Sequence, residues 1–178
     1  GITENLLKKT DAKPRHAYLG RLLTFIVLGF LQSTLVGLGD LFYLQIQCVD
    51  PVRFMISVWF TSLVFVNIMY AFTYAFGDIG KAICVFLLVI QVAGAGGSFP
   101  VQMLPESFQV INPLLPFVHA IAAMHENIAG YYGNVWISEL GALSIFLAAS
   151  LMLGLVLRKP TAKLNAWIIE KLEDTKIM

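Results

Sequence analysis

The stretch GAGGSFPVQMLPESFQVINPLLP, which runs from Gly94 to Pro116, decides how the chain folds. It contains four prolines, three glycines and no Lys or Arg, and hydrophobic segments flank it on both sides. The prolines exclude one straight helix, and the lack of basic residues is not typical of a cytoplasmic loop. The stretch therefore predicts a re-entrant hairpin at membrane depth. Irregular backbone is tolerated there only where protein or a water-filled cavity covers its polar groups.

The composition of the chain indicates an integral membrane protein. Of its 178 residues, 58% are hydrophobic and 13% are charged, and the mean hydropathy is +0.77. Residues 22–52 and 82–157 contain no Lys or Arg at all. A soluble domain needs a charged surface, so lipid must replace water over much of this one. The net charge of +1, with basic residues gathered near both ends of the chain, gives no reason to expect a nucleic acid partner.

The hydrophobic pattern predicts an all-α, polytopic helix bundle that uses the lipid bilayer as its solvent. The length needed to cross a bilayer suggests four spans. The third is short, so we expect the first part of the hairpin to complete it. Before the spans, residues 1–21 predict a cytoplasmic or interfacial segment, with a short helix on each side of Pro14; after them, residues 158–178 predict a cytoplasmic amphipathic tail. The predicted membrane elements are spans at about 22–44, 54–76, 82–98 and 135–157, and an outward hairpin and helix at 97–133.

Four spans place both ends of this chain on one side of the membrane. Every Lys and Arg except Arg53 then lies on that side. Because cytoplasmic loops carry an excess of basic residues, both termini are predicted to be cytoplasmic. The hairpin is predicted to face outward from the cell membrane.

Two partial motifs do not support an enzyme or a cofactor site. The turn at residues 77–81, GDIGK, has two residues between its glycines and is followed by Ala82, so it does not match a phosphate-binding loop. The pair His125 and Glu126 begins like a zinc protease motif, but Ala129 stands where the second His should be. A pairing of a nucleophile with a base cannot be named either. We therefore expect no catalytic residue, no metal site and no cofactor.

Three amide side chains are predicted to share one depth. Gln32, Asn67 and Gln91 each lie about 15 to 17 Å from the cytoplasmic boundary at 1.5 Å per residue, close to the bilayer midplane. An amide that faces lipid is costly, so we expect all three to turn inward and to bond one another, Ser33 or Thr34, or water. This midplane polar layer is either helix glue or part of a transport path.

Several local motifs together carry a resemblance to a known family. These are PRHAYLGRLL at 14–23, DPVRF at 50–54, FGDIGKA at 76–82 and, above all, GGSFPVQMLPESFQVINPLLPFVHAI at 96–121. From Pro14 to about Pro160 the chain resembles the carboxy-terminal membrane part of the phage infection protein (YhgE/Pip) family, which is similar to type-2 ABC exporter permeases. The resemblance is most specific at the hairpin positions Gly96, Gly97, Phe99, Pro100, Leu104, Pro105, Pro113 and Pro116.

The resemblance implies partners and a function. Type-2 permeases have more spans than are predicted here, which implies a further pair of spans and a large extracellular domain outside this chain. It also implies a homodimer or pairing with a second permease half, and export of a lipophilic or envelope substrate with a nucleotide-binding ATPase. The basic residues that would contact the ATPase are Lys8, Lys9, Lys13 and Arg15.

The name of the family supports an alternative function. In it, the bundle does not transport; it anchors an extracellular domain and serves as an assembly platform that phages or envelope proteins bind. Copurification of an ATPase with the full-length protein would separate the two functions.

Overall fold

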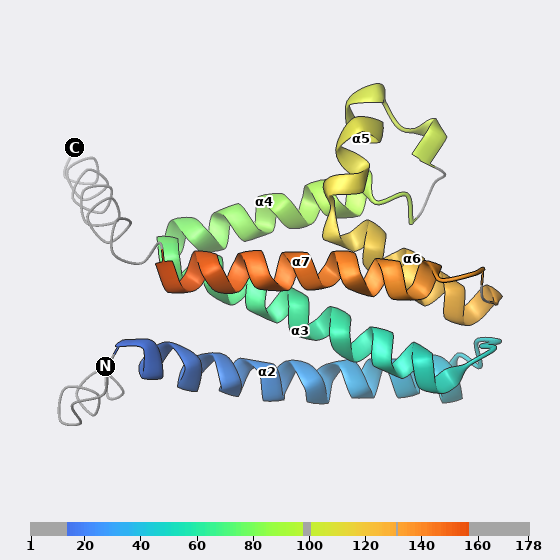
Figure 1. Cartoon of the computed structure of the whole chain (residues 1–178), viewed down its shortest axis with the longest axis horizontal. Helices are drawn as coiled ribbons and strands as arrows, with labels where there is room; N and C mark the ends of the chain where they lie inside the picture. The colour runs from blue at the N-terminus through green and yellow to red at the C-terminus, as the bar shows by residue number, and fades with distance from the viewer. Residues whose placement is uncertain (1–13, 98–100, 131, 157–178) are drawn as a thin grey trace.

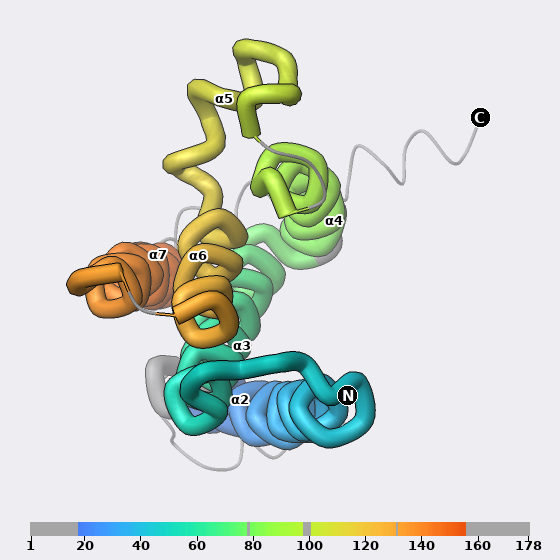
Figure 2. Tube along the Cα trace, turned by 90° about the vertical axis from the view of Figure 1, so that its right-hand side faces the viewer, coloured from blue at the N-terminus to red at the C-terminus, as the bar shows by residue number. Residues whose placement is uncertain are grey.

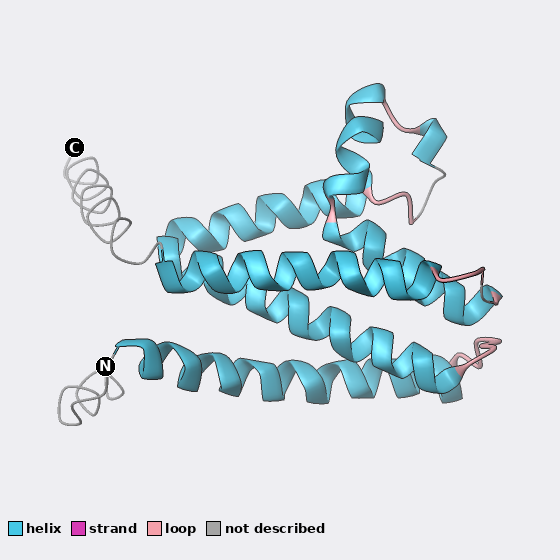
Figure 3. Ribbon diagram, viewed as in Figure 1, coloured by secondary structure: helices cyan, strands magenta, loops and turns pink. Residues whose placement is uncertain are grey.

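The computed structural model describes residues 14–97, 101–130 and 132–156, and all regular structure within them is helical (Figure 3). Three of the helices are long and apolar enough to cross a membrane, and a bent helix pair passes the same test as one unit. The predicted all-α membrane bundle is confirmed.

The first helix, α2, spans Pro14–Leu38 and continues through one π-helical turn at Gly39–Tyr43. Proline is favoured at the first helical position because it lacks the N–H that would be unbonded there. We predicted a short helix after Pro14 and a separate span from residue 22. Instead one helix covers both, since no residue between Pro14 and Leu38 breaks it.

The second helix, α3, spans Pro51–Phe76. The Asp50 side chain caps its first turn by accepting hydrogen bonds from the backbone N–H groups of Val52 and Arg53, both at 3.1 Å. Such a cap satisfies donors that have no partner within the helix. The position of the helix start therefore follows from the sequence Asp-Pro.

Helix α4 spans Asp78–Gly94 and is separated from α3 by Gly77 alone. Gly77 has φ 61°, a conformation that glycine adopts without steric cost. A side chain at Gly80 would lie 2.1 Å from the carbonyl oxygen of Phe72, so the two helices meet very closely here. The predicted turn at residues 77–81 is therefore much shorter, and α4 begins four residues before the predicted Ala82.

The hairpin region consists of short helices. Single 3-10 turns at Val101–Met103 and Asn112–Leu114 flank α5, Glu106–Ile111, and α6 spans Pro116–Ala129. The chain bends by 74° between the segment Glu106–Leu114 and α6. Figure 1 shows α5 beside the end of α4, with α6 running back toward the end of the bundle at which α2 ends.

The last described helix, α7, spans Val135–Val156 and packs against α3 and α6. Figure 2 shows α6 beside α7, with α2 and α4 on other sides of α3. Val64, Ala120 and Leu143, from α3, α6 and α7, are almost fully buried and form the core where these helices meet. We call the end with Pro14, Gly77 and Val156 the terminal end, and the opposite end the hairpin end (Figure 1).

Candidate functional site

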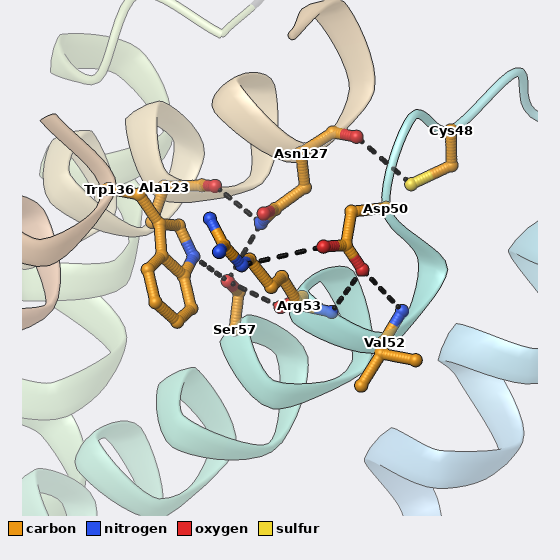
Figure 4. Close-up of polar contacts among 8 residues, drawn as sticks. All are labelled: Cys48, Asp50, Val52, Arg53, Ser57, Ala123, Asn127 and Trp136. Carbon is orange, nitrogen blue, oxygen red and sulfur yellow. Dashed lines mark hydrogen bonds and ion pairs between the residues drawn. The ribbon is translucent and has the colours of Figure 1, made fainter. Parts of the chain in front are cut away.

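A buried hydroxyl joins three helices at the hairpin end. Ser57 Oγ of α3 accepts hydrogen bonds from Asn127 Nδ2 of α6 at 2.9 Å and from Trp136 Nε1 of α7 at 2.8 Å, and it donates one to the carbonyl of Arg53 at 3.0 Å. A serine hydroxyl offers one donor and two acceptor sites, so its capacity is fully used. Figure 4 shows the three side chains converging from their separate helices. We call Ser57, Asn127 and Trp136 the Ser57 cluster.

The Ser57 cluster also holds the loop before α3. The backbone carbonyl of Asn127 accepts hydrogen bonds from the backbone N–H groups of Val49 at 3.0 Å and Asp50 at 3.3 Å. The thiol of Cys48 donates to the same carbonyl at 3.1 Å (Figure 4). Asn127 is fully buried, and its Nδ2 also donates to the carbonyl of Ala123 at 2.7 Å. One residue of α6 therefore connects α3 and its preceding loop.

A charged pair covers the cluster on its outer side. Arg53 Nε lies 3.4 Å from Asp50 Oδ2, and the two side chains are 46% and 31% exposed. The Arg53 guanidinium also lies over the Trp136 ring, 5.3 Å from its centroid. Asp50 and Arg53 therefore form a partly solvated ion pair beside the Ser57 cluster.

A second polar contact joins α6 to α7. His119 Nδ1 lies 2.6 Å from Glu139 Oε2, and His119 Nε2 lies 3.1 Å from the carbonyl oxygen of Pro113. Because Pro113 precedes the bend, this histidine also fixes the turn between the two arms of the hairpin. The hairpin end is thus held together by two independent polar contacts to α7.

The opposite half of the molecule contains a groove. Its volume is about 500 Å³, and residues of α2, α3 and the first turn of α4 line it. We call it the lateral groove. Its lining is mostly apolar and consists of Phe25, Leu28, Gly29, Gln32, Val66, Met69, Tyr70, Thr73 and Lys81.

Close contact between α2 and α3 forms the wall of the groove. Ser62 Oγ donates a 3.0 Å hydrogen bond to the carbonyl of Gly29, and a side chain at Gly29 would lie 2.7 Å from Val66 Cγ2. Further along, Trp59 Nε1 donates to Thr34 Oγ1 at 2.8 Å. These polar bonds fix the register of the two helices without using the lining side chains.

The hairpin residues that the sequence predicted form the region between α4 and α6. Gly96 has φ 73°, and a side chain at Gly94 would lie 2.9 Å from Leu115 Cδ1, so both glycines let the chain turn and pack back. Asn112 Nδ2 donates to the Gly94 carbonyl at 2.7 Å. Pro116 begins α6. Of the other predicted positions, Gly97 lies close to Ile121, and Pro105 precedes α5. The backbone carbonyls of Leu104 and Pro113 accept hydrogen bonds. Phe99 and Pro100 lie outside the described residues.

The structure does not bring the three predicted midplane amides together. Asn67 is buried against α7, where its Nδ2 donates to Ser150 Oγ and, at 3.2 Å, to the carbonyl of Leu147. Gln91 is buried on α4, and its Oε1 has no hydrogen-bond partner. Gln32 is exposed and lines the lateral groove. Residues at equal depth can still face different directions. Val66 lines the groove together with Gln32, and Asn67, the next residue of α3, points about 100° away from it.

Of the predicted ATPase contacts, only Arg15 lies in the described part of the chain, in the first turn of α2. Lys8, Lys9 and Lys13 lie outside the described residues, as does the predicted tail at 158–178.

Sequence reasoning missed the Ser57 cluster. Ser57 is 70 residues from Asn127 and 79 from Trp136, so no local spacing connects them. The pairing of His119 with Glu139, 20 residues apart, was missed for the same reason. The one usable signal was that Trp136 begins a predicted span, where its N–H needs a partner.

Comparison with known proteins decides the family. The model of the ABC-2 family transporter proteins matches residues 5–156, which is most of the chain. The chain belongs to the ABC-2 family of transporter membrane proteins. The resemblance predicted from the motifs is therefore confirmed, and the permease-like membrane role follows from it. ABC-2 proteins are transporter membrane domains, and three of the described helices here are long and apolar enough to cross a bilayer.

This ABC-2 domain also resembles a curated bacterial protein. It is 29% identical over 134 residues to the uncharacterized protein YhgE of Bacillus subtilis (strain 168). The match covers 73% of this chain but only 17% of that relative, so the chain spans less than a fifth of its length. No solved structure matches the chain.

Proposed function

We propose that this ABC-2 domain is the membrane half of an exporter that moves a lipophilic or cell-envelope substrate with the help of an ATPase subunit. The contrast between the two ends of the bundle carries this proposal. The hairpin end is held together by the Ser57 cluster, whereas the lateral groove lies in the other half. A transporter needs a substrate entry on one side and a closed exit on the other.

The orientation follows from the distribution of basic residues. Arg53 is the one Lys or Arg in the sequence between Leu22 and Leu157 apart from Lys81, and it lies at the hairpin end. The other basic residues come before Leu22 or after Leu157. The positive-inside rule then places the terminal end in the cytoplasm. In this orientation the hairpin narrows the outward exit, and a substrate enters the groove from the cytoplasmic leaflet.

The partners follow from the same arrangement. The ATPase binds at the terminal end, where Lys8, Lys9, Lys13 and Arg15 contact either its surface or anionic headgroups. The bundle pairs with a second copy or with another permease half, because among the described helices α2 packs extensively against α3 alone.

One observation favours a second candidate function, in which the domain anchors an extracellular domain without transporting. Apolar side chains are exposed at the hairpin end: Phe42 and Tyr43 are 76% and 88% exposed, and Leu44, Val49 and Val52 are also exposed. An extracellular domain of a longer protein, used by phages or envelope proteins as a docking receptor, would cover such a rim.

Purification of the full-length protein with its native partners separates the two functions. Export requires that an ATPase copurifies and that its hydrolysis rate in liposomes rises when the membrane protein is present. Reversal of charge at Lys8, Lys9 and Lys13 should then abolish copurification. Retention of an envelope protein without any ATPase would favour the anchor.

A further inference from the structure

The lateral groove has the shape and polarity of a binding site for a lipid. Its volume of about 500 Å³ lies within the range of small-molecule sites. Between Phe25 and Gln32, α2 advances about 10 Å, which is roughly two thirds of one leaflet of a hydrocarbon core. In the deeper half of the lining, Gln32 is the only polar side chain. The groove therefore suits an extended apolar chain.

Charge lies at one end of the groove only. Lys81 lines it at the terminal end, where Thr73 of α3 is the neighbouring polar residue in the lining. Arg21 lies one turn before Phe25 on the same face of α2 and is exposed. Lysine and arginine at such a position place their charge at the headgroup level while their methylenes lie along the apolar wall. Lys81 therefore stands at the mouth of an apolar groove, with Arg21 one helical turn beyond the lining on α2.

We infer that the lateral groove binds one acyl chain of an anionic phospholipid from the adjoining leaflet, with its phosphate at Lys81 and Arg21. The positive charge at the mouth favours an anionic lipid over a protein helix, because such a helix would have to present an acidic residue at the same depth. A zwitterionic lipid gains less from the two cations. The inference uses the groove that the proposed function assigns to substrate entry, but the phospholipid binds there whether or not it is transported.

The contacts of Gly29 fix the distance between the two helices that form the groove. The hydrogen bond from Ser62 to the Gly29 carbonyl and the close approach of Val66 hold α2 against α3 at the deep end. Met69, which is 55% exposed, projects into the space that remains. A larger side chain at Met69 fills this space without disturbing the contact between the helices.

The test uses the full-length protein in phosphatidylcholine nanodiscs that contain phosphatidylglycerol with a diazirine in one acyl chain. After illumination, label should concentrate on the peptides that carry Phe25–Gln32 and Val66–Thr73. Unlabelled phosphatidylglycerol should compete, and added phosphatidylcholine should not.

Four variants make the result specific. Met69→Trp should remove at least about four fifths of the groove label. Met152→Trp, at a methionine 66% exposed on α7, should remove none. Lys81→Gln should lower labelling about fivefold, which corresponds to one basic residue near an anionic surface, and Lys81→Arg should retain it. Uniform labelling of all lipid-facing helices, or groove labelling that phosphatidylcholine lowers as much as phosphatidylglycerol does, would overturn the inference.

Discussion

Trp136 Nε1 donates a 2.8 Å hydrogen bond to Ser57 Oγ across 79 residues of sequence. This bond and the one from Asn127 make a single hydroxyl the point at which α3, α6 and α7 meet at the hairpin end (Figure 4). Because the two donors lie on separate helices, removal of the hydroxyl takes the same acceptor from both.

The first prediction concerns this hydroxyl. Ser57→Ala leaves the N–H groups of Asn127 and Trp136 without their shared acceptor, and we expect the free energy of unfolding in detergent to fall by about 2 kcal/mol. Ser144→Ala is the matched control, because Ser144 is exposed on α7 and bonds only the Leu140 carbonyl of its own helix, at 2.8 Å. Equal melting temperatures for the two variants would show that the cluster does not stabilise the fold.

The second prediction concerns the contact between α2 and α7 at the terminal end. A side chain at Gly154 would lie 2.2 Å from Tyr18 Oη, and Tyr18 is held between Tyr70 and Tyr74 at centroid distances of 5.0 and 4.7 Å. Gly154→Ala should therefore lower the free energy of unfolding by about 1 to 3 kcal/mol.

Gly141 provides the control, because nothing lies within 4 Å of a side chain added there on the same helix. Gly141→Ala should be neutral or should stabilise by up to about 1 kcal/mol through helix propensity. Adding Tyr18→Phe to Gly154→Ala should restore part of the lost stability, since it removes the nearest atom. A double variant no more stable than Gly154→Ala would argue against this contact.

The third prediction concerns the pair that joins α6 to α7. His119 and Glu139 are 18% and 22% exposed, so their interaction is partly shielded from solvent. A double-mutant cycle with His119→Gln and Glu139→Gln should give a coupling energy of about 1 kcal/mol, measured by chemical unfolding. Additive effects of the two substitutions would mean that the pair contributes nothing beyond its separate residues.

The fourth prediction concerns orientation. In a background without Cys48 and Cys84, Glu106→Cys at the start of α5 should react with a membrane-impermeant maleimide added to intact cells. Lys163→Cys, seven residues beyond the end of α7, should react only after the cells are opened. The reverse labelling pattern would show that the predicted orientation is wrong.

The sequence predicted the all-helical bundle, and local signals account for its helix boundaries. Pro14, Asp50 with Pro51, and Pro116 each stand at a helix start, and Gly94 and Gly96 mark the turn into the hairpin, although the first two spans were predicted from residues 22 and 54. These residues act through their own backbone conformation, so one sequence is enough to interpret them.

Prediction failed where the outcome depended on which helices become neighbours. Asn67 bonds α7 rather than Gln32 or Gln91, because α3 turns that face toward α7 and the adjacent face toward α2. Depth along a helix can be counted from the sequence, but the direction of a side chain around the bundle depends on tertiary packing. The lateral groove and the Ser57 cluster both arise from such packing.

The proposed export function requires the hairpin end to open, and Cys48 reports on this opening most directly. Its thiol donates to the carbonyl of Asn127, so it is released when α6 moves away from α3. The measurement is the rate at which an impermeant maleimide labels Cys48 in the full-length protein with its ATPase, in a Cys84→Ala background. We expect slow labelling without nucleotide and severalfold faster labelling during ATP hydrolysis. The same labelling rate in both states, while ATP is being hydrolysed, would contradict the account.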